Sequence, residues 1–340
     1  MSSGPDTHAE ATAFPGVRTR VWRKGVLERE NFPFEEVSDY LEQPDCLVWA
    51  DLCAPDAATL DQLAEELCLD PHAVEDAGSL HERPKATRYA THLFLSTYAL
   101  RAGKGADALD MTHVSAFCTK QAFVTVRLDD GFDIEQVVEH WDGNADLMRL
   151  GPRALEHGLL DVIVDQYFEA IQSFDEEIDT IEGTLFEDTS GSMKQVQIRA
   201  YEVRKALLRA RRVVLPMREV VNTVMRRGET GEGAVELAPY FEDLYDHVLR
   251  AAEWTESLRD MISSIFDTNM ALADSRLNLI MKKLTSWAAI IAVPTAVTGY
   301  FGQNVPYPGF DSHWGFVLSV ALIVVISAAL YLAFKRKEWL

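Results

Sequence analysis

Two long runs of uncharged, mostly apolar residues lie near the end of the chain, at 284–301 and 314–334. At about 1.5 Å of helical rise per residue, each can cross a hydrocarbon layer of about 30 Å. The pattern predicts a helical hairpin in a membrane, with the polar remainder of the chain ahead of it. The first run is near the lower length limit and contains Pro294. A buried core helix is therefore the alternative interpretation of that run.

Short apolar or β-rich runs alternate with helical patterns between residues 17 and 150. We expect strands around 47–49, 93–95 and 123–126, and helices over 55–67 and 71–77. Ala54-Pro55 and Asp70-Pro71 are typical helix starts, with proline at the first helical position. The pattern predicts one α/β domain and leaves its strand order open.

Only helical patterns follow residue 152. We expect three long helices over 152–188, 192–228 and about 235–301, with breaks at 189–191 and 228–231. The first has apolar residues at spacings of three and four, namely Ile171, Phe174, Ile178, Ile181 and Leu185. The third contains no proline or glycine between Tyr240 and Ala292. It can run without interruption into the first apolar run, and so long a helix favours assembly with copies of itself.

Charge refines this picture in two ways. The formal net charge of −21, from 53 acidic and 32 basic residues, argues against a nucleic-acid partner and suits a chain that attracts cations. Basic residues flank the hairpin at Lys282-Lys283 and at 335–337, whereas the segment 302–313 carries only Asp311. The positive-inside rule then places both termini in the cytoplasm.

Residues 1–16 have a composition typical of disorder and lack a signal-peptide pattern. The four cysteines are expected to be reduced core residues.

One face of the third helix changes from polar to apolar to small residues. Steps of three and four align Asn278, Met281, Leu284, Ala288, Ala292, Thr295 and Gly299, and the stripe continues to Gly302. Such a face can line a channel, with a narrow apolar ring at Met281 and Leu284 that gates by dewetting. Close helix packing is the alternative, because small residues inside membranes permit near approach. Two membrane segments cannot enclose a pore, so the channel hypothesis requires a homo-oligomer.

The tripeptide Gly302-Gln303-Asn304 lies where the first membrane helix is expected to end. Asparagine presents a carbonyl oxygen without a charge. A ring of such oxygens can hold a hydrated divalent cation through its waters, which suits Mg²⁺ because Mg²⁺ dehydrates reluctantly. By itself the G-x-N pattern is a weak motif.

Several segments together resemble the CorA family of divalent-cation channels. They are the stretches 278–285, 300–304 and 334–340 around the membrane hairpin, and 74–76, 81–85 and 239–247 in the polar part. The resemblance covers roughly residue 45 to the end, with the parts in the family's order. It implies a domain plan of 17–150 (α/β), 151–283 (long helical stalk), 284–301 (pore-lining helix), 302–313 (external loop), 314–334 (outer helix) and 335–340 (basic tail).

The resemblance also implies an assembly and a set of functional residues. The chain would form a funnel-shaped homopentamer in the cell membrane, with Asn304 as the external ion-binding ring and the stripe from Asn278 to Thr295 along the pore. A regulatory Mg²⁺ would join Asp76 to Asp243 of a neighbouring subunit. Lys335, Arg336 and Lys337 would form a basic collar around the cytoplasmic end of the membrane helices.

The chain departs from the family at the loop, where Gln303 replaces the methionine of the usual Gly-Met-Asn signature. The zinc-transporting ZntB branch also varies this position. Gated influx of Mg²⁺, with Co²⁺ or Ni²⁺ as further ions, is the leading hypothesis. The alternatives are a ZntB-like zinc transporter, proton-coupled or not, and a membrane-anchored scaffold without transport.

No P-loop or H-E-x-x-H motif supports an enzyme, and no organic cofactor is expected. His247, close to Asp243 and Asp246, is interpreted as a surface residue.

Overall fold

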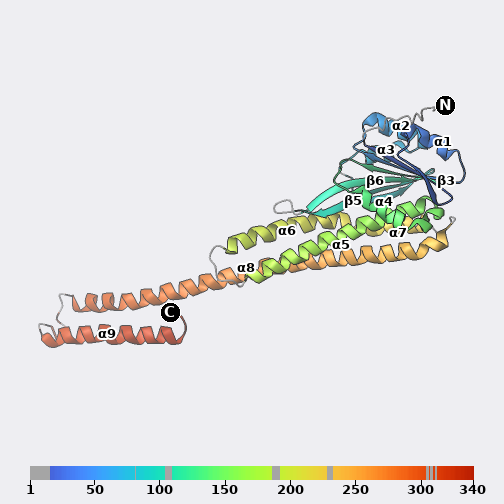
Figure 1. Cartoon of the computed structure of the whole chain (residues 1–340). Coiled ribbons are helices and arrows are strands. Elements are labelled where there is room, and N and C mark those ends of the chain that lie inside the picture. The colour runs from blue at the N-terminus through green and yellow to red at the C-terminus, as the bar shows by residue number, and fades with distance from the viewer. Residues whose placement is uncertain are drawn as a thin grey trace, which may run out of the picture. The chain divides into compact units, whose positions relative to one another are not determined.

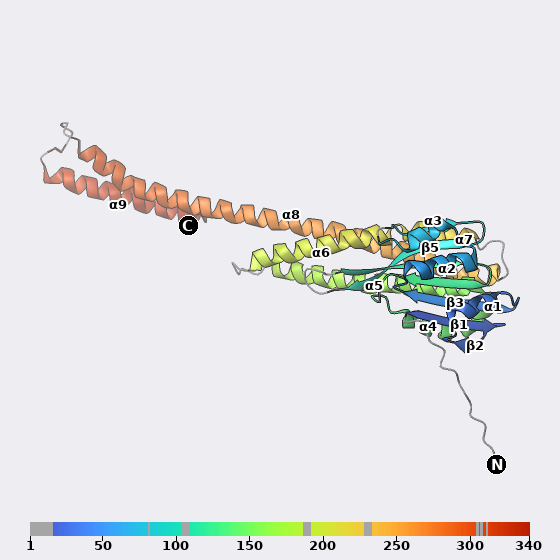
Figure 2. The same ribbon diagram turned by 90° about the horizontal axis from the view of Figure 1, so that it is seen from above.

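A mixed sheet organises the first part of the chain in the computed structural model, which describes residues 16–80, 82–103, 109–185, 192–227, 233–303, 306, 309–310 and 312–340. Within these residues the strands are β1 (Val17–Arg23), β2 (Val26–Glu30), β3 (Cys46–Cys53), β4 (Lys85–Arg88), β5 (Leu93–Ala102), β6 (Leu109–Cys118) and β7 (Ala122–Arg127). Their order is β2-β1-β3-β7-β6-β5-β4, and β3 pairs with β7 in parallel while the other neighbours are antiparallel. Figure 2 shows β2 and β1 along one side of the sheet.

Three short helices cover one face of the sheet. They are α1 (Val37–Leu41), which follows a 3₁₀ turn at Phe34–Glu36, α2 (Ala57–Leu67) and α3 (Pro71–Ala77) (Figure 1). Alternate residues of β3 face them, because successive side chains of a strand point to opposite faces. Val48, Ala50 and Leu52 pack here with Leu63 of α2 and Ala73 of α3 in one buried apolar cluster.

The opposite face is covered by α4 (Ile134–Gly143) and α5 (Pro152–Leu185), which are joined by a 3₁₀ helix at Ala145–Leu150. Trp141 of α4 is the centre of this layer. Its ring meets Trp49 of β3 edge-on at 5.0 Å, and the rings of Trp22 and Phe123 at 6.3 Å. Such edge-to-face pairs add to the energy of burial. Its Nε1 donates to the Leu155 carbonyl of α5 at 3.2 Å, so the indole links strand, α4 and α5.

Gly158 allows α4 and α5 to approach closely. A Cβ atom at this position of α5 would lie 2.5 Å from Trp141 Nε1, 2.6 Å from Trp141 Cδ1 and 3.1 Å from His140 Cδ2. Only a residue without a side chain can therefore stand beneath the indole. The contact fixes His140 and Trp141 over the first turns of α5.

The two helices expected in the α/β part are present, with one difference at a helix end. Pro71–Ala77 begins where predicted, with Asp70 as its N-cap. The helix expected from Pro55 begins instead at Ala57, because the Asp56 side chain accepts a hydrogen bond from the Thr59 N–H and caps it. The four cysteines all lie within the described residues and form no disulfide; Cys46 and Cys118 are buried, as expected, but Cys68 is exposed rather than in the core.

The single helix predicted over 192–228 is wrong. The chain forms α6 (Ser192–Val214) and α7 (Met217–Arg227), separated at Leu215 and Pro216. Proline has no N–H for the helical ladder and its ring collides with the preceding turn, so α6 ends before it. The Pro216 carbonyl then accepts from the N–H groups of Glu219 and Val220 and starts α7. The breaks expected at 189–191 and 228–231 lie outside the described residues.

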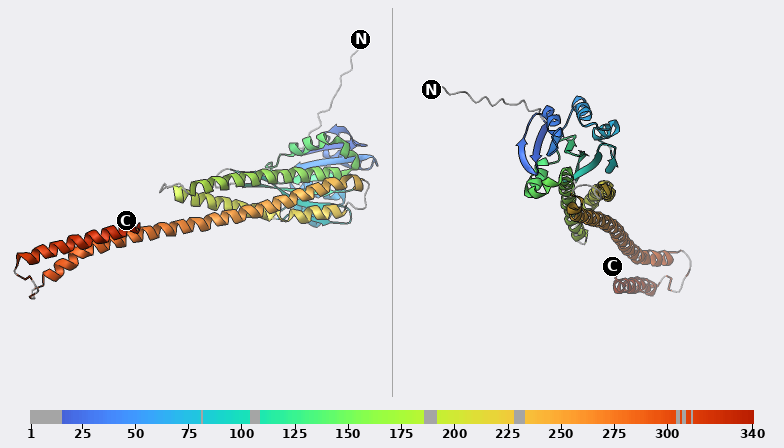
Figure 3. Two further views of the ribbon diagram at one scale, coloured as in Figure 1. Left: turned by 90° about the horizontal axis from the view of Figure 1, so that it is seen from below. Right: turned by 90° about the vertical axis from the view of Figure 1, so that its right-hand side faces the viewer.

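The long helix α8 extends over Ala234–Phe301, in agreement with the unbroken pattern from about 235 to 301. Contacts divide the chain into two compact units, Met1–Ser263 and Ser264–Leu340, so the start of α8 belongs to the first and the rest to the second. In the first unit α5, α6 and the start of α8 run side by side (Figure 3), and Ile171, Phe174, Ile178 and Ile181 of α5 are buried, as predicted. This unit extends well beyond residue 150 because α5 packs on β5.

The second unit pairs the end of α8 with α9 (His313–Arg336), which runs back along it (Figures 1 and 2). The helix α9 continues two residues past the end of the second apolar run, through Lys335 and Arg336. Basic side chains stabilise a helix C-terminus, which explains the extension.

Replacing Gly158 by alanine tests the contact between α4 and α5. Because the new Cβ would collide with the Trp141 ring, Gly158→Ala is expected to destabilise the folded state by about 1–3 kcal/mol. Gly183→Ala, in the same helix, is the matched control, since its Cβ would meet no atom within 4 Å. The control is expected to be neutral or to stabilise by up to about 1 kcal/mol. Thermal unfolding of the purified proteins measures both, and equal midpoints for the two variants would contradict the close approach.

Candidate ion pathway and cation sites

In the described part of the chain, two helices are long and apolar enough to cross a membrane, and their apolar runs, 284–301 and 314–334, lie in the second unit. Val235–Phe301 and His313–Arg336 are the stretches long and apolar enough within the described residues, and almost none of their apolar windows is buried inside the chain. A core helix of a soluble domain would instead be covered by its own chain. The hairpin therefore presents apolar side chains to its surroundings, as a membrane segment does.

The predicted pore stripe lies on one exposed face of α8. Asn278, Met281, Leu284, Ala288, Ala292, Thr295 and Gly299 are all exposed in the single chain. Met281 and Leu284 are the bulky members, at 58% and 62% exposure. Some intervening positions are covered, with Ser286 buried and Val293 and Val297 half-buried, whereas Ile291 is 65% exposed. The stripe thus lies on a different side of α8 from the residues that the hairpin itself covers.

The polar groups of this helix are arranged around Pro294. The Thr298 hydroxyl donates to the Pro294 carbonyl at 2.8 Å, and the Thr295 hydroxyl donates to the Ile291 carbonyl at 3.3 Å. A threonine bonded back to its own helix keeps its oxygen lone pairs for another donor or a cation. The helix continues through Pro294 without a break. The low burial of its apolar window argues against the alternative of a core helix.

The end of α8 leads into the loop that carries the G-x-N motif. The Gly302 N–H donates to the Thr298 carbonyl at 2.8 Å and closes the helix. Gly302 and Gln303 are exposed, whereas Asn304 lies outside the described residues. Further along, Gly309 and Gly315 touch so closely that a Cβ at Gly315 would collide with the Gly309 carbonyl. The sequence analysis missed this glycine pair, which returns the chain to the start of α9.

The residues of the predicted basic collar lie beside aromatic side chains at the end of α9. The Lys335 ammonium lies 6.0 Å from the ring centre of Tyr331, and that of Lys337 lies 5.8 Å from the ring centre of Trp339. The Trp339 ring stacks on Phe334 at 5.7 Å. Lysine and tryptophan together are typical of a membrane–water interface.

Asp76, the first predicted regulatory ligand, is paired with a cation of its own chain. The Lys85 ammonium lies 2.7 Å from carboxylate oxygens of both Asp76 and Glu82. Burial alone would lower the pKa of Lys85, but the hydrogen bonds to Asp76 and Glu82 outweigh it and the pKa is raised. The ammonium therefore stays charged and neutralises part of the carboxylate pair.

Asp243, the second predicted ligand, lies in a different neighbourhood. Its side chain is 71% exposed, and its Oδ2 lies 3.8 Å from His247 Nε2, one turn further along α8. His247 was expected at the surface, but it is half-buried with its ring against Phe168. Asp243 borders a cavity of about 360 Å³, whose other lining residues are His140, Asn144, Leu147, His157, Asp161, Pro239 and Tyr240.

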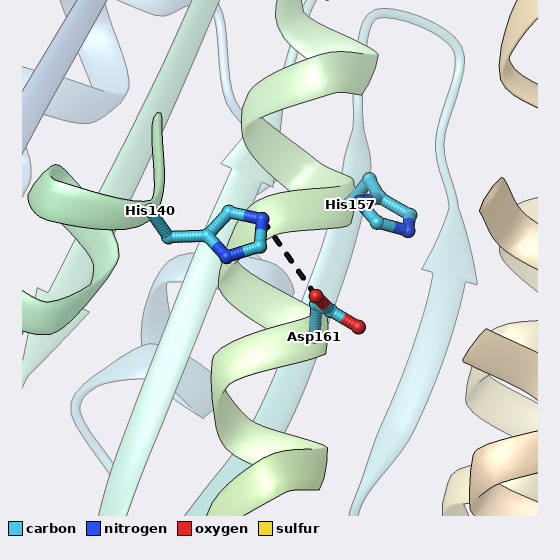
Figure 4. A group of neighbouring side chains, drawn as sticks. All are labelled: His140, His157 and Asp161. Atoms are coloured by element: carbon cyan, nitrogen blue, oxygen red, sulfur yellow. Dashed lines mark ion pairs between the residues drawn. The ribbon is translucent and has the colours of Figure 1, made fainter. Parts of the chain in front are cut away.

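That cavity contains a group of potential metal ligands that the sequence analysis missed. One ligand atom each from His140, His157 and Asp161 lie within 4.8 Å of one another (Figure 4). Burial lowers the pKa of His157, an effect that Asp161 and the Tyr240 carbonyl oppose. The i, i+4 spacing of His157 and Asp161 was a possible signal. His140, however, comes from another helix and no local pattern connects it to them.

A buried histidine lies beside the Asp76 group. His113 of β6 shares a 2.9 Å hydrogen bond with the Ser96 hydroxyl, and its ring contacts that of Tyr98 at 4.9 Å. Burial lowers the pKa of His113 to about 4, although Glu82 and Asp76 act in the opposite direction. The imidazole is therefore neutral at physiological pH.

These features define the class of the protein. It combines an α/β unit, long helices and a C-terminal pair of membrane-spanning helices whose first member exposes a polar-to-small face. The family described as "CorA-like Mg2+ transporter protein" matches residues 45–336, and the chain belongs to this family of transporters.

Individual relatives agree in sequence and in fold. The cobalt/magnesium transport protein CorA of Thermotoga maritima is 28% identical over 284 residues, which cover 83% of this chain and 80% of the relative. The complete structure of the CorA magnesium transporter from Methanocaldococcus jannaschii superposes with a TM-score of 0.75 at 20% identity, over 95% of this chain and 98% of that one. The ZntB cytoplasmic domain from Vibrio parahaemolyticus shares the fold of that part, with a TM-score of 0.54 at 16% identity, over 76% of this chain and 99% of that one.

Stability should fall in mild acid because of His113. Its folded-state pKa of about 4 lies below the ordinary 6.5, so between these values the unfolded chain binds a proton that the folded chain does not. The free energy of unfolding therefore decreases as the pH falls from 6.5 towards 4, by about 3 kcal/mol at most. Thermal unfolding between pH 7.5 and 4.5 is expected to show a smaller loss for His113→Asn than for the unchanged protein. His72→Gln, at an exposed position of α3, should keep the full loss, and an unaltered profile in His113→Asn would contradict this assignment.

Proposed function

We propose that this chain forms a homopentameric channel that admits Mg²⁺ into the cell and closes when cytoplasmic Mg²⁺ is plentiful. Both termini lie in the cytoplasm in this proposal, and α8 of each subunit lines the pore while α9 surrounds it. Membership of the CorA family supports the transport of divalent cations. Co²⁺ is a further ion, since the Thermotoga relative is a cobalt/magnesium transport protein.

The exposed stripe of α8 is the observation that carries the proposal. An apolar face such as Met281 and Leu284 is stable inside a membrane, but Asn278 and Thr295 on the same face are polar and gain from contact with water or an ion. Met270, Leu277 and Ile280 are also exposed, at 68%, 61% and 59%, ahead of the first apolar run. Neighbouring copies of α8 would cover these side chains. A ring of α8 helices satisfies both demands, because neighbouring subunits cover Met270, Leu277 and Ile280 while the stripe from Asn278 to Thr295 faces a central path.

The loop would supply the external cation site of this channel. Asn304 is the proposed ligand ring, with Gly302 and the amide of Gln303 beside it. A ring of neutral carbonyl oxygens binds a hydrated Mg²⁺ through its waters and so avoids the cost of dehydrating the ion. The basic collar of Lys335, Arg336 and Lys337 would lie at the opposite membrane surface.

Gating would depend on Asp76 and Asp243 of adjacent subunits. A divalent cation between two carboxylates relieves their repulsion and holds subunits together. In each subunit Asp243 is exposed and thus accessible to a neighbour, while Asp76 is paired with Lys85. Mg²⁺ would have to displace the Lys85 ammonium, at least in part, to reach Asp76.

Replacing the proposed loop ligand tests the channel. Asn304→Ala is expected to abolish most Mg²⁺ influx into liposomes that contain the purified protein, because the mouth loses its carbonyl ring. Gln303→Met, which restores the family's usual residue, should retain influx and serves as the control. Crosslinking in detergent should show pentamers in both variants. Undiminished influx through Asn304→Ala would refute the assignment of the loop.

The same liposomes separate the alternatives. Mg²⁺ influx that needs no proton gradient supports the channel. Zn²⁺ influx that depends on a proton gradient would instead support a ZntB-like transporter. Gln303 and the fold shared with the ZntB cytoplasmic domain are the reasons for testing this alternative. A monomer in mild detergent that carries neither ion would support the scaffold hypothesis.

Charge reversal at Asp243 tests the gating site. Mg²⁺ is expected to protect the cytoplasmic region of the unchanged protein from protease, because the ion joins subunits. In Asp243→Lys this Mg²⁺-dependent protection should be reduced, since an ammonium replaces a ligand. Glu253→Lys makes the same change of charge at another exposed position of α8 and should keep the protection. If Asp243→Lys is protected as well as the unchanged protein, Asp243 is not part of the gate.

A further inference from the structure

Three potential metal ligands converge where α4 crosses α5. His140 comes from α4, whereas His157 and Asp161 lie one turn apart on the same side of α5 (Figure 4). Residues four apart on a helix are neighbours on its surface. The Trp141–Gly158 contact brings His140 over this turn, so the three side chains are held together by the packing of the core.

Two of the three ligand atoms have nearly the spacing of a coordination site. His140 Nε2 and Asp161 Oδ2 lie 3.7 Å apart, which is too long for a hydrogen bond. With metal–ligand bonds of about 2.0–2.1 Å, two ligands of a tetrahedral ion are separated by about 3.3 Å. A shift of a few tenths of an ångström is enough for this pair, whereas the full group, whose ligand atoms lie within 4.8 Å of one another, must contract further around an ion. A direct hydrogen bond between His140 Nε2 and Asp161 Oδ2 is therefore weak, whereas a cation between the two atoms would suit their separation.

His157 is arranged like a histidine that binds a metal. It is buried, its ring edge meets Phe241 at 5.2 Å, and its Nε2 lies 3.2 Å from the Tyr240 carbonyl. A hydrogen bond to a carbonyl fixes the proton on Nε2 and leaves the Nδ1 lone pair as the ligand. Histidines that bind metals almost always donate their other ring N–H to a carbonyl or carboxylate in this way.

The cavity leaves room to complete the coordination sphere. Asn144 and Asp243 also line its volume of about 360 Å³, which is large enough for several water molecules. Two imidazoles and one carboxylate with open positions select Zn²⁺, Co²⁺ or Ni²⁺ over Mg²⁺, which prefers oxygen ligands.

We infer that His140, His157 and Asp161 form a cytoplasmic-unit binding site for a transition-metal divalent cation, with Zn²⁺ as its representative. The site is built within one subunit, from α4 and α5 beside the start of α8. It is distinct from the pairing of Asp76 with Asp243 and does not depend on whether the chain conducts Mg²⁺. An ion there would fasten α4 to α5 and place a positive charge next to Asp243.

Equilibrium dialysis of the full-length protein in detergent tests the site. Zn²⁺ is offered in the presence of excess Mg²⁺, which occupies sites made only of carboxylates. One Zn²⁺ per subunit is expected to bind, and His140→Gln should weaken that binding by about tenfold or more. His140 is the preferred position because its side chain is 26% exposed and contributes little to the core. Asp161→Asn, on the other helix, is the second variant and should also weaken binding.

His247→Gln is the matched control, because this histidine of α8 lies next to Asp243 but outside the group. It should leave Zn²⁺ binding unchanged, as should Asn304→Ala, which removes only the proposed pore ligand. Binding that survives both His140→Gln and Asp161→Asn would overturn the inference. So would an equal loss in His247→Gln, since it would move the ion to the His247–Asp243 pair. Thermal unfolding with and without Zn²⁺ provides a second readout, and the midpoint should rise for the unchanged protein and not for His140→Gln.

Discussion

The contact between Trp141 and Gly158 is the packing constraint on which the first unit depends. The indole fills the centre of the layer between the sheet and α5, where it meets Trp49 and donates to the Leu155 carbonyl. It can do so only because α5 has no side chain at Gly158. A close-packed interior transmits any displacement of such a residue to its neighbours. The absence of a Cβ atom at Gly158 therefore determines where α4 and His140 lie, and with them the cavity beside Asp243.

Much of the fold could be predicted from local signals. Buried runs indicated β3, β5 and β7, and the absence of proline and glycine between Tyr240 and Ala292 indicated α8. The strand order is set by contacts between distant segments, which no local pattern encodes, and so it stayed open. Pro216 was a visible signal that was missed, because the apolar spacing on both sides of it continues and conceals the break between α6 and α7.

The candidate sites were predictable only where their residues are close in sequence or aligned on one helix. The stripe from Asn278 to Gly299 needs only helical spacing, and all of its members share an exposed face. The group of His140, His157 and Asp161 requires two helices to cross at a particular point, and that point is chosen by Trp141 and Gly158. The ion pair of Asp76 could not be predicted from the sequence, because Asp76 lies on α3 and its partner Lys85 lies at the start of β4.

The Lys85 ammonium gives Asp76 a resident competitor for any cation that arrives from solution. Because it is tethered to the chain, it does not diffuse away and its local concentration never falls. A divalent ion that bound Asp76 as proposed would have to wait for the ammonium to withdraw at least in part, and its apparent affinity would be lowered by the fraction of molecules in which that occurs. In the proposed gate, the length and freedom of one lysine side chain would thereby determine the ion concentration at which the carboxylate responds. Evolution can retune such a threshold through Lys85 or Glu82 while every proposed ligand of the ion remains unchanged.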